Sequence, residues 1–261
     1  MVVGTNRTAN TVANEGTVHP MSGVLNPVIM RLTLRATLSR KRALLFVAPA
    51  VLLIGISALL KWKAHSSVWP PEFLGVVGFL ILALTALIVG GSVIGAEVED
   101  GSIVHLLATP VSRRVVIGAK YVVAVGLTVI FAAVPELVAG LIATGGATKL
   151  ALGVFVGALA GSVMYNAIFV MLSVVTTRAI AWGLLYVLIW EGVLGNLVAG
   201  ARLLSVGQYS LGIANSIAHD PALNAALSLP TAVILGAVVT AAALAVAVSR
   251  LASFSLKGEP A

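Results

Sequence analysis

Long apolar runs separated by short polar connections dominate the pattern of this chain. Six runs are long enough to be membrane-spanning helices, because crossing the hydrocarbon core of a bilayer takes about 20 predominantly apolar residues. The pattern therefore predicts an all-α integral membrane protein with six transmembrane helices. The predicted spans lie at about 43–60, 73–96, 115–135, 150–174, 179–199 and 230–249.

Composition supports this prediction and excludes several other classes of protein. Of the 261 residues, 59% are hydrophobic and only 10% are charged, whereas a soluble domain carries about 25% charged residues. The absence of cysteine excludes disulfides, thiolate metal sites and cysteine nucleophiles. The net charge of +7 would suggest nucleic-acid binding in a soluble protein. Here the basic residues flank apolar spans, so we expect membrane lipid around the chain and no nucleic-acid partner.

Lysine and arginine residues predict the orientation of the spans. Most of them fall on the side that holds both chain termini, together with the second-to-third and fourth-to-fifth connections. By the positive-inside rule, that side is cytoplasmic, so we expect a multi-pass protein of the bacterial cell membrane with cytoplasmic N- and C-termini. Four basic residues are predicted on the opposite side: Lys61, Lys63, Lys149 and Arg202.

The segments outside the spans differ in character. Residues 1–25 are polar and predict a disordered cytoplasmic tail, and residues 26–261 predict one transmembrane domain. In 26–42, apolar residues and arginines alternate at roughly helical spacing, which favours an amphipathic helix on the cytoplasmic membrane face over a plain basic flank. Residues 200–229 are too interrupted to span, so we expect short helices that dip into the outer leaflet there.

The most informative polar connection is 97–114 (EVEDGSIVHLLATPVSRR). Acidic and small residues typical of a helix start precede apolar residues on one helical face, and a proline follows. This short helix either lies on lipid headgroups or docks into a groove on a cytoplasmic partner. Its acidic residues favour docking, because anionic lipids repel them. The residues that define the connection are Glu97, Glu99, Asp100, Gly101, Ser102, Ile103, Leu106, Leu107, Pro110, Ser112 and Arg113.

The 97–114 connection resembles the signature of type-2 ATP-binding-cassette (ABC) exporter permeases, in which acids, Gly-Ser, an apolar pair and Pro-x-Ser-Arg lie between the second and third spans. With the predicted topology, the resemblance covers about residues 26–255. It implies that 97–114 is a coupling helix seated in a cleft of a separate ATP-binding subunit. It also implies an elbow helix at 26–42 and re-entrant helices before the last span. The implied assembly pairs two permeases, identical or homologous, with two copies of the ATP-binding subunit.

The chain has no G-x-x-x-x-G-K-[ST] phosphate-binding loop, so ATP and Mg are expected on the partner subunit. We expect this chain to be no enzyme by itself and to bind no cofactor or metal. Given the resemblance, the expected function is export by alternating access. An apolar path lined with small residues would suit a hydrophobic or amphipathic substrate, lipid or drug-like, better than sugars or ions. The alternative is a stand-alone secondary transporter driven by an ion gradient. An intramembrane enzyme would need a Ser/His or paired-carboxylate site, which the spans lack.

Polar residues inside the predicted spans are candidates for the translocation path. Glu191 is the strongest, because an ionised side chain at the bilayer centre costs on the order of 2.5–3.5 kcal/mol. It either lines the path or is a neutral acid hydrogen-bonded between helices. Tyr165, Asn166 and Asn196 could bind substrate, although a role in holding helices together is favoured.

Three glycines at four-residue spacing, Gly153, Gly157 and Gly161, predict close helix packing in the fourth span. Packing within the subunit is favoured over a dimer interface, because such spacing is common in spans rich in glycine and alanine. In the third span, Lys120 lies near the cytoplasmic end, where it is expected to snorkel to the interface. Glu136 is expected near the outer interface.

Overall fold

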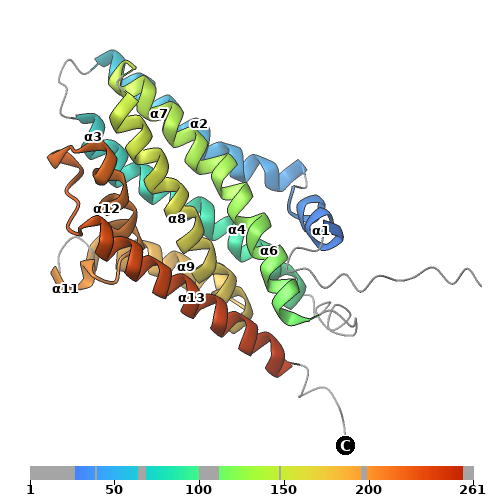
Figure 1. Ribbon diagram of the computed structural model, residues 1–261. Helices are drawn as coiled ribbons and strands as arrows, with labels where there is room; N and C mark the ends of the chain where they lie inside the picture. Colours follow the sequence, from blue (N-terminus) through green and yellow to red (C-terminus); the bar gives the residue numbers. More distant parts are fainter. Residues whose placement is uncertain are drawn as a thin grey trace, which may run out of the picture.

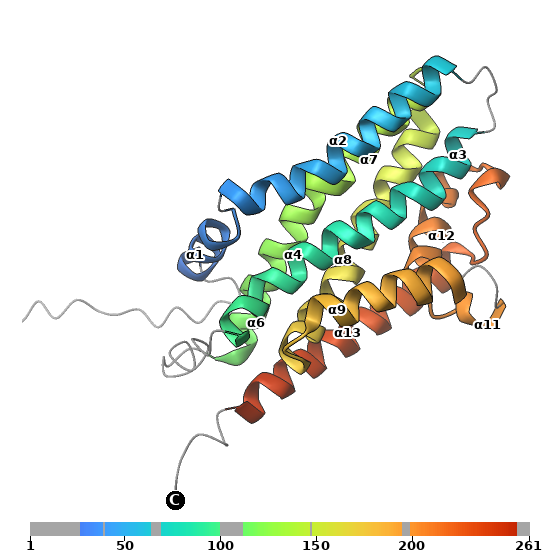
Figure 2. The ribbon, with the colours of Figure 1, turned by 180° about the vertical axis from the view of Figure 1, so that it is seen from behind.

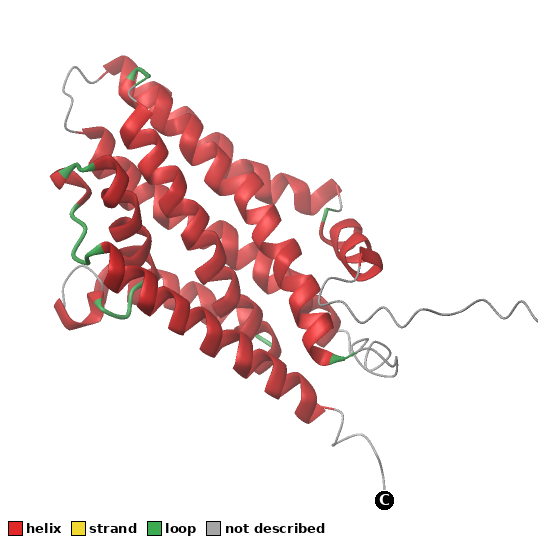
Figure 3. Cartoon of the chain, in the orientation of Figure 1, coloured by secondary structure: helices red, strands yellow, loops and turns green. Residues whose placement is uncertain are grey.

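The computed structural model describes residues 27–38, 40–63, 69–99, 112–146, 148–194 and 199–254, and this part of the chain is helical and without strands (Figures 1 and 3). The predicted all-α membrane fold is therefore confirmed. Five described helices are long and apolar enough to cross a membrane: Leu44–Lys63, Trp69–Ile94, Arg113–Thr144, Thr148–Val175 and Leu229–Ala252.

The helix at the predicted fifth span is shorter than these five helices. The apolar helix there runs over Ala179–Leu194, and residues 195–198 lie outside the described part. The count of six spans therefore stays a prediction. The predicted division into a tail and one domain also stays a prediction, because residues 1–26 lie outside the described part.

Three of the apolar helices contain a π-helical stretch, a geometry that is rare in proteins. The second span joins α3, η1 and α4, the third joins α6, η2 and α7, and the fifth joins α9 and η3. The bounds along the chain are α1 Pro27–Thr37, α2 Arg40–Lys63, α3 Trp69–Phe73, η1 Leu74–Gly78, α4 Phe79–Glu99, α6 Arg113–Thr128, η2 Val129–Ala133, α7 Val134–Thr144, α8 Thr148–Val175, α9 Ala179–Leu185, η3 Tyr186–Leu194, α11 Ala199–Arg202, α12 Val206–Ala218, η4 Pro221–Leu223 and α13 Leu229–Phe254.

Helix α8 lies at the centre of the bundle and packs against α4, α7, α12 and α13 (Figure 1). Its buried side chains include Tyr165 and Phe169, which belong to the main apolar core. Seen from behind, α9 and η3 lie beside α4 (Figure 2). Helices α2 and α13 are mostly exposed, and their outward faces are apolar, as lipid contact requires.

The turn between α7 and α8 is short because two glycines adopt left-handed backbone angles. Gly145 has φ 66° and Gly146 has φ 98°, a region that other residues rarely occupy. The Gly146 N–H donates to the carbonyl of Leu141, and the Gly145 N–H donates to that of Ile142, which satisfies carbonyls at the end of α7. The third span therefore continues to Thr144, well beyond the predicted end at 135.

The segment predicted to dip into the outer leaflet contains α12, which is too short to span and lies along α8. The close contact depends on the glycines of α8. A Cβ atom added at Gly153 would lie 2.6 Å from the carbonyl oxygen of Ala214, and one at Gly157 would lie 2.6 Å from that of Ser210. A Cβ at Gly161 would meet Leu82 and Ser210 at 2.7 Å. The four-residue glycine spacing thus allows two helix backbones of one subunit to touch.

The N-terminal helix differs from its predicted bounds. Helix α1 ends at Thr37, and residues 40–42 already belong to α2. The side chains of Thr33 and Thr37 are buried, whereas Leu32 is 62% exposed, so the apolar residues do not all share the buried face. The placement of α1 on the cytoplasmic membrane surface stays a prediction.

Candidate functional site

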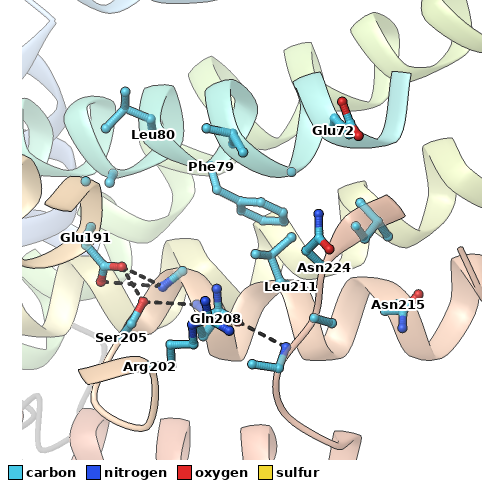
Figure 4. Close-up of a pocket in the computed structure, with 18 of the residues that line it drawn as sticks. Glu72, Phe79, Leu80, Glu191, Arg202, Ser205, Gln208, Leu211, Asn215 and Asn224 are labelled. Carbon is cyan, nitrogen blue, oxygen red and sulfur yellow. Dashed lines mark hydrogen bonds between the residues drawn. The ribbon is translucent and has the colours of Figure 1, made fainter. Parts of the chain in front are cut away.

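A cavity of about 870 Å³ lies between the second span and the segment that precedes α13 (Figure 4). The second-span wall is largely apolar, and Phe79 points from α4 toward Leu211 of α12. The opposite wall, from α12 and residues 221–226, adds polar side chains such as Gln208 and Asn224. A space with one largely apolar wall and one mixed apolar and polar wall suits an amphipathic molecule.

Glu191 lies on η3 at the edge of this cavity, and its carboxylate accepts five hydrogen bonds from four donor groups. Oε1 accepts from the Tyr186 hydroxyl at 3.0 Å and from the Val206 N–H at 2.9 Å. Oε2 accepts from the Ser205 hydroxyl. The Gly207 N–H donates to both oxygens, at 3.4 and 3.3 Å. Glu191 therefore joins η3 to the first turn of α12 and also lines the cavity, so features of both predicted roles are present.

The local sequence explains why α12 begins where Glu191 can reach it. Ser205 is the N-cap of α12, and its hydroxyl accepts a hydrogen bond from the Gln208 N–H at 3.2 Å. Ser-x-x-Gln is the spacing of a capping box, a helix-start signal visible in the sequence. The first N–H groups of a helix have no partner within it, and its N-terminus attracts negative charge. The Glu191 carboxylate meets both requirements.

Aromatic rings support this part of the cavity wall. Tyr165 is 1% exposed, lines the cavity and stacks on Phe169 with ring centroids 6.0 Å apart. Phe169 in turn meets Tyr186 edge-on at 6.3 Å. The Tyr165 hydroxyl lies 3.4 Å from the position that a Cβ atom on Gly207 would occupy. Tyr165 thus lies close to the first turn of α12, and the aromatic contacts link α8 to η3.

Of the other two path candidates, Asn166 is not among the described residues that line the cavity. Asn166 is buried, and its Nδ2 donates to the Thr128 hydroxyl and to the Ser162 carbonyl, both at 2.8 Å. The hydrogen bond to Thr128 connects α8 to α6 and agrees with a role in holding helices together, whereas the one to Ser162 lies within α8. Asn196 lies outside the described residues.

The expectation for Lys120 in the third span proves wrong, and Glu136 of the same span is also enclosed. Lys120 does not snorkel, because it is 2% exposed and its Nζ donates to the Val93 carbonyl of α4 at 2.9 Å. Glu136 is fully buried within the chain, and neither carboxyl oxygen has a hydrogen-bond partner among the described residues, while its place near the outer interface stays a prediction. A Cβ atom on Gly78 would lie 2.7 Å from Glu136 Oε1, so the carboxyl group fills the space beside that glycine.

Most of the 97–114 connection lies outside the described residues. The residues concerned are Asp100, Gly101, Ser102, Ile103, Leu106, Leu107 and Pro110. Glu97 and Glu99 lie in the last turns of α4, Ser112 precedes α6, and Arg113 begins it. Because α4 packs against α6, the connection joins two adjacent helices at one end of the bundle (Figure 1).

A profile of the ABC-2 family of transporter proteins matches residues 37–186, more than half of the chain. The chain belongs to the ABC-2 transporter family. It is therefore a multi-pass membrane permease, a subunit that is not itself the ATPase and that works with an ATP-binding partner. No match is found among the curated proteins. The match includes the 97–114 connection but ends before Glu191 and α12, so the cavity wall they form lies outside it.

The sequence did not indicate several residues of the cavity. Glu72 and Arg202 lie at its rim on segments outside the predicted spans, and Gln208 follows the helix start of α12. In the sequence, each of these residues appears only as a polar residue beside an apolar run. Ser205 and Gly207 were missed as partners of Glu191, although the capping-box spacing at Ser205 marks the helix start.

Proposed function

We propose that this chain is the membrane-spanning subunit of an ATP-driven exporter and that its substrate is hydrophobic or amphipathic. The observation that carries the proposal is the ABC-2 family match over 37–186, which includes the segment that resembles a coupling helix. The cavity supports the substrate class, because its apolar second-span wall faces polar groups of α12 and residues 221–226.

In the proposed assembly, two permeases, identical or homologous, pair with two ATP-binding subunits, and ATP and Mg bind to the latter. The 97–114 connection docks into each ATP-binding subunit on the cytoplasmic side, where both termini of the permease also lie. ATP drives alternating access only if the nucleotide-bound partner binds one permease conformation more tightly than the other. The coupling segment is the physical link through which that difference reaches the spans.

Co-purification from native membranes in mild detergent tests this proposal. We expect an ATP-hydrolysing subunit in about equal amounts with the wild-type permease. It should be lost with the Ile103→Asp/Leu107→Asp double variant, because charge on the apolar face prevents helix-in-groove docking. The matched control, Ile103→Leu/Leu107→Ile, keeps that face apolar and should retain the partner. Failure of any ATPase to associate with stable wild-type protein would refute the exporter.

A stand-alone secondary transporter is the alternative, and it predicts a different energy source. Such a transporter would continue to work without an ATP-binding subunit and would stop when an ionophore collapses the ion gradient. Transport that persists after the gradient is collapsed but stops on ATP depletion supports the exporter.

A further inference from the structure

We propose that Glu191 is a positioning residue whose carboxylate clasps the first turn of α12 and so holds η3 in place as a wall of the cavity. The Glu191 clasp consists of Tyr186, Glu191, Ser205, Val206 and Gly207. This role goes beyond the proposed exporter function and does not depend on which substrate the permease carries.

The hydrogen-bond chemistry shows that the carboxylate is already occupied. Both oxygens of Glu191 are engaged, and the N–H groups of Val206 and Gly207 can only donate. An ionised carboxylate accepts hydrogen bonds and donates none, so it matches these partners. The same N–H groups belong to the turn of α12 that lacks partners within the helix. Glu191 therefore completes the helix start of α12, which leaves it little capacity to bind a substrate directly.

The steric fit at Gly207 is close. A Cβ atom there would lie 3.0 Å from Glu191 Oε2, so a side chain would press on the carboxylate. An added methyl group at this position would require the Glu191 carboxylate to shift by a few tenths of an ångström. The clasp can thus be perturbed from α12 without changing Glu191 itself.

Helix α12 is the fixed side of the clasp, because its backbone touches α8 along the glycines described above. By contrast, few side chains of η3 are buried against the rest of the chain. Among its residues only Val187 is buried, while Leu188 and Val193 are about half exposed. Further ties are the hydrogen bond from Trp190 Nε1 to the Leu204 carbonyl at 3.2 Å and the edge-on contact of Tyr186 with Phe169 of α8. Loss of the clasp should therefore move η3 away from α12 rather than move α12 away from α8.

The absence of native cysteine allows this movement to be measured with single-cysteine reporters. V187C reports on η3, and V154C, an equally buried valine on α8 that packs near α7, is the matched control. Each reporter is combined with Glu191→Gln, with Gly207→Ala, or with Gly126→Ala, whose added methyl group meets nothing within 4 Å. The rate of labelling by N-ethylmaleimide is measured on the full chain in its native membranes.

We expect Glu191→Gln and Gly207→Ala each to accelerate labelling of V187C by about 10- to 100-fold. This is the range for losing one hydrogen bond to a charged group when labelling follows the open population. In Gly207→Ala the loss arises because the added methyl group displaces the Glu191 carboxylate from its donors. Labelling of V154C should stay at the wild-type rate, and Gly126→Ala should change neither reporter.

Two results would overturn the clasp. The first is labelling of V187C at the wild-type rate in both clasp variants. The second is equal acceleration of V154C, which would indicate general loosening of the bundle. If Glu191→Gln does not accumulate in membranes, the labelling rate of V187C in Gly207→Ala alone tests the proposal. Because labelling requires neither ATP nor substrate, failure of the clasp and failure of the exporter proposal are distinguished.

Discussion

The contact between α8 and α12 makes a sharp prediction for Gly157→Ala. The added Cβ would lie 2.6 Å from the Ser210 carbonyl oxygen and 2.9 Å from the Ala214 Cβ, and the Phe79 ring is 3.0 Å away. The closest of these atoms belongs to helix backbone, which cannot rotate away as a side chain can. The helices must therefore separate, and overpacking of this kind costs about 1–3 kcal/mol.

The matched control is Gly126→Ala, where the added methyl group meets nothing within 4 Å. Replacing glycine by alanine inside a helix is favourable by up to about 1 kcal/mol when nothing obstructs it. The two substitutions are chemically identical, yet we expect opposite signs. Gly157→Ala should lower the free energy of unfolding by about 1–3 kcal/mol, and Gly126→Ala should leave it unchanged or raise it.

Heating the purified protein in detergent and measuring the fraction that remains monodisperse by size-exclusion chromatography gives an apparent Tm for each variant. The same comparison in lipid nanodiscs checks that the ranking of the variants by apparent Tm does not depend on the detergent. An apparent Tm for Gly157→Ala equal to or above that of Gly126→Ala would refute direct backbone contact between α8 and α12.

Two further predictions concern buried groups of the third span. Gly78→Ala should lower the free energy of unfolding by about 1–3 kcal/mol, because its methyl group would lie 2.7 Å from Glu136 Oε1. In a Glu136→Ala background the same substitution should cost little. Additive effects of the two substitutions in this double-mutant cycle would contradict the contact. Lys120→Ala should destabilise by about 2–4 kcal/mol through the lost side-chain volume and the lost hydrogen bond to the Val93 carbonyl. Lys120→Met, which keeps the volume, should cost less, and equal Tm losses for the two variants would show that packing of the stem contributes nothing.

The spans were predictable because a bilayer forces backbone groups to pair within each helix, so long apolar runs become helices. Their ends were less predictable. Pro135 and Glu136 suggested an interface in the sequence, yet the helix continues to Thr144 and ends at the left-handed Gly145. A polar residue marks a helix end only if it is exposed, and Glu136 is enclosed by neighbouring helices. That enclosure depends on the tertiary arrangement.

Some residues of the site could be predicted from the sequence, but the contacts between them could not. Glu191 stood out because ionisable groups are rare inside a membrane, and Ser205 marks a helix start through its capping-box spacing. Their hydrogen bond joins residues fourteen positions apart. Local periodicity carries no information about such a pairing. The spacing of apolar residues also does not predict the π-helical stretch in which Glu191 lies.

Two of the segments that line the cavity, α12 and η3, are held by different physical means, and this difference bears on how a permease could change shape. The wall of α12 depends on backbone contact with α8, which leaves no space for the helices to slide without separation. The wall of η3 depends on hydrogen bonds to one carboxylate, which water or other donors can replace one at a time. A transition between two arrangements needs an element that can leave its partner at moderate cost. Of these two segments, η3 meets that requirement, and Glu191 is the group that sets the cost.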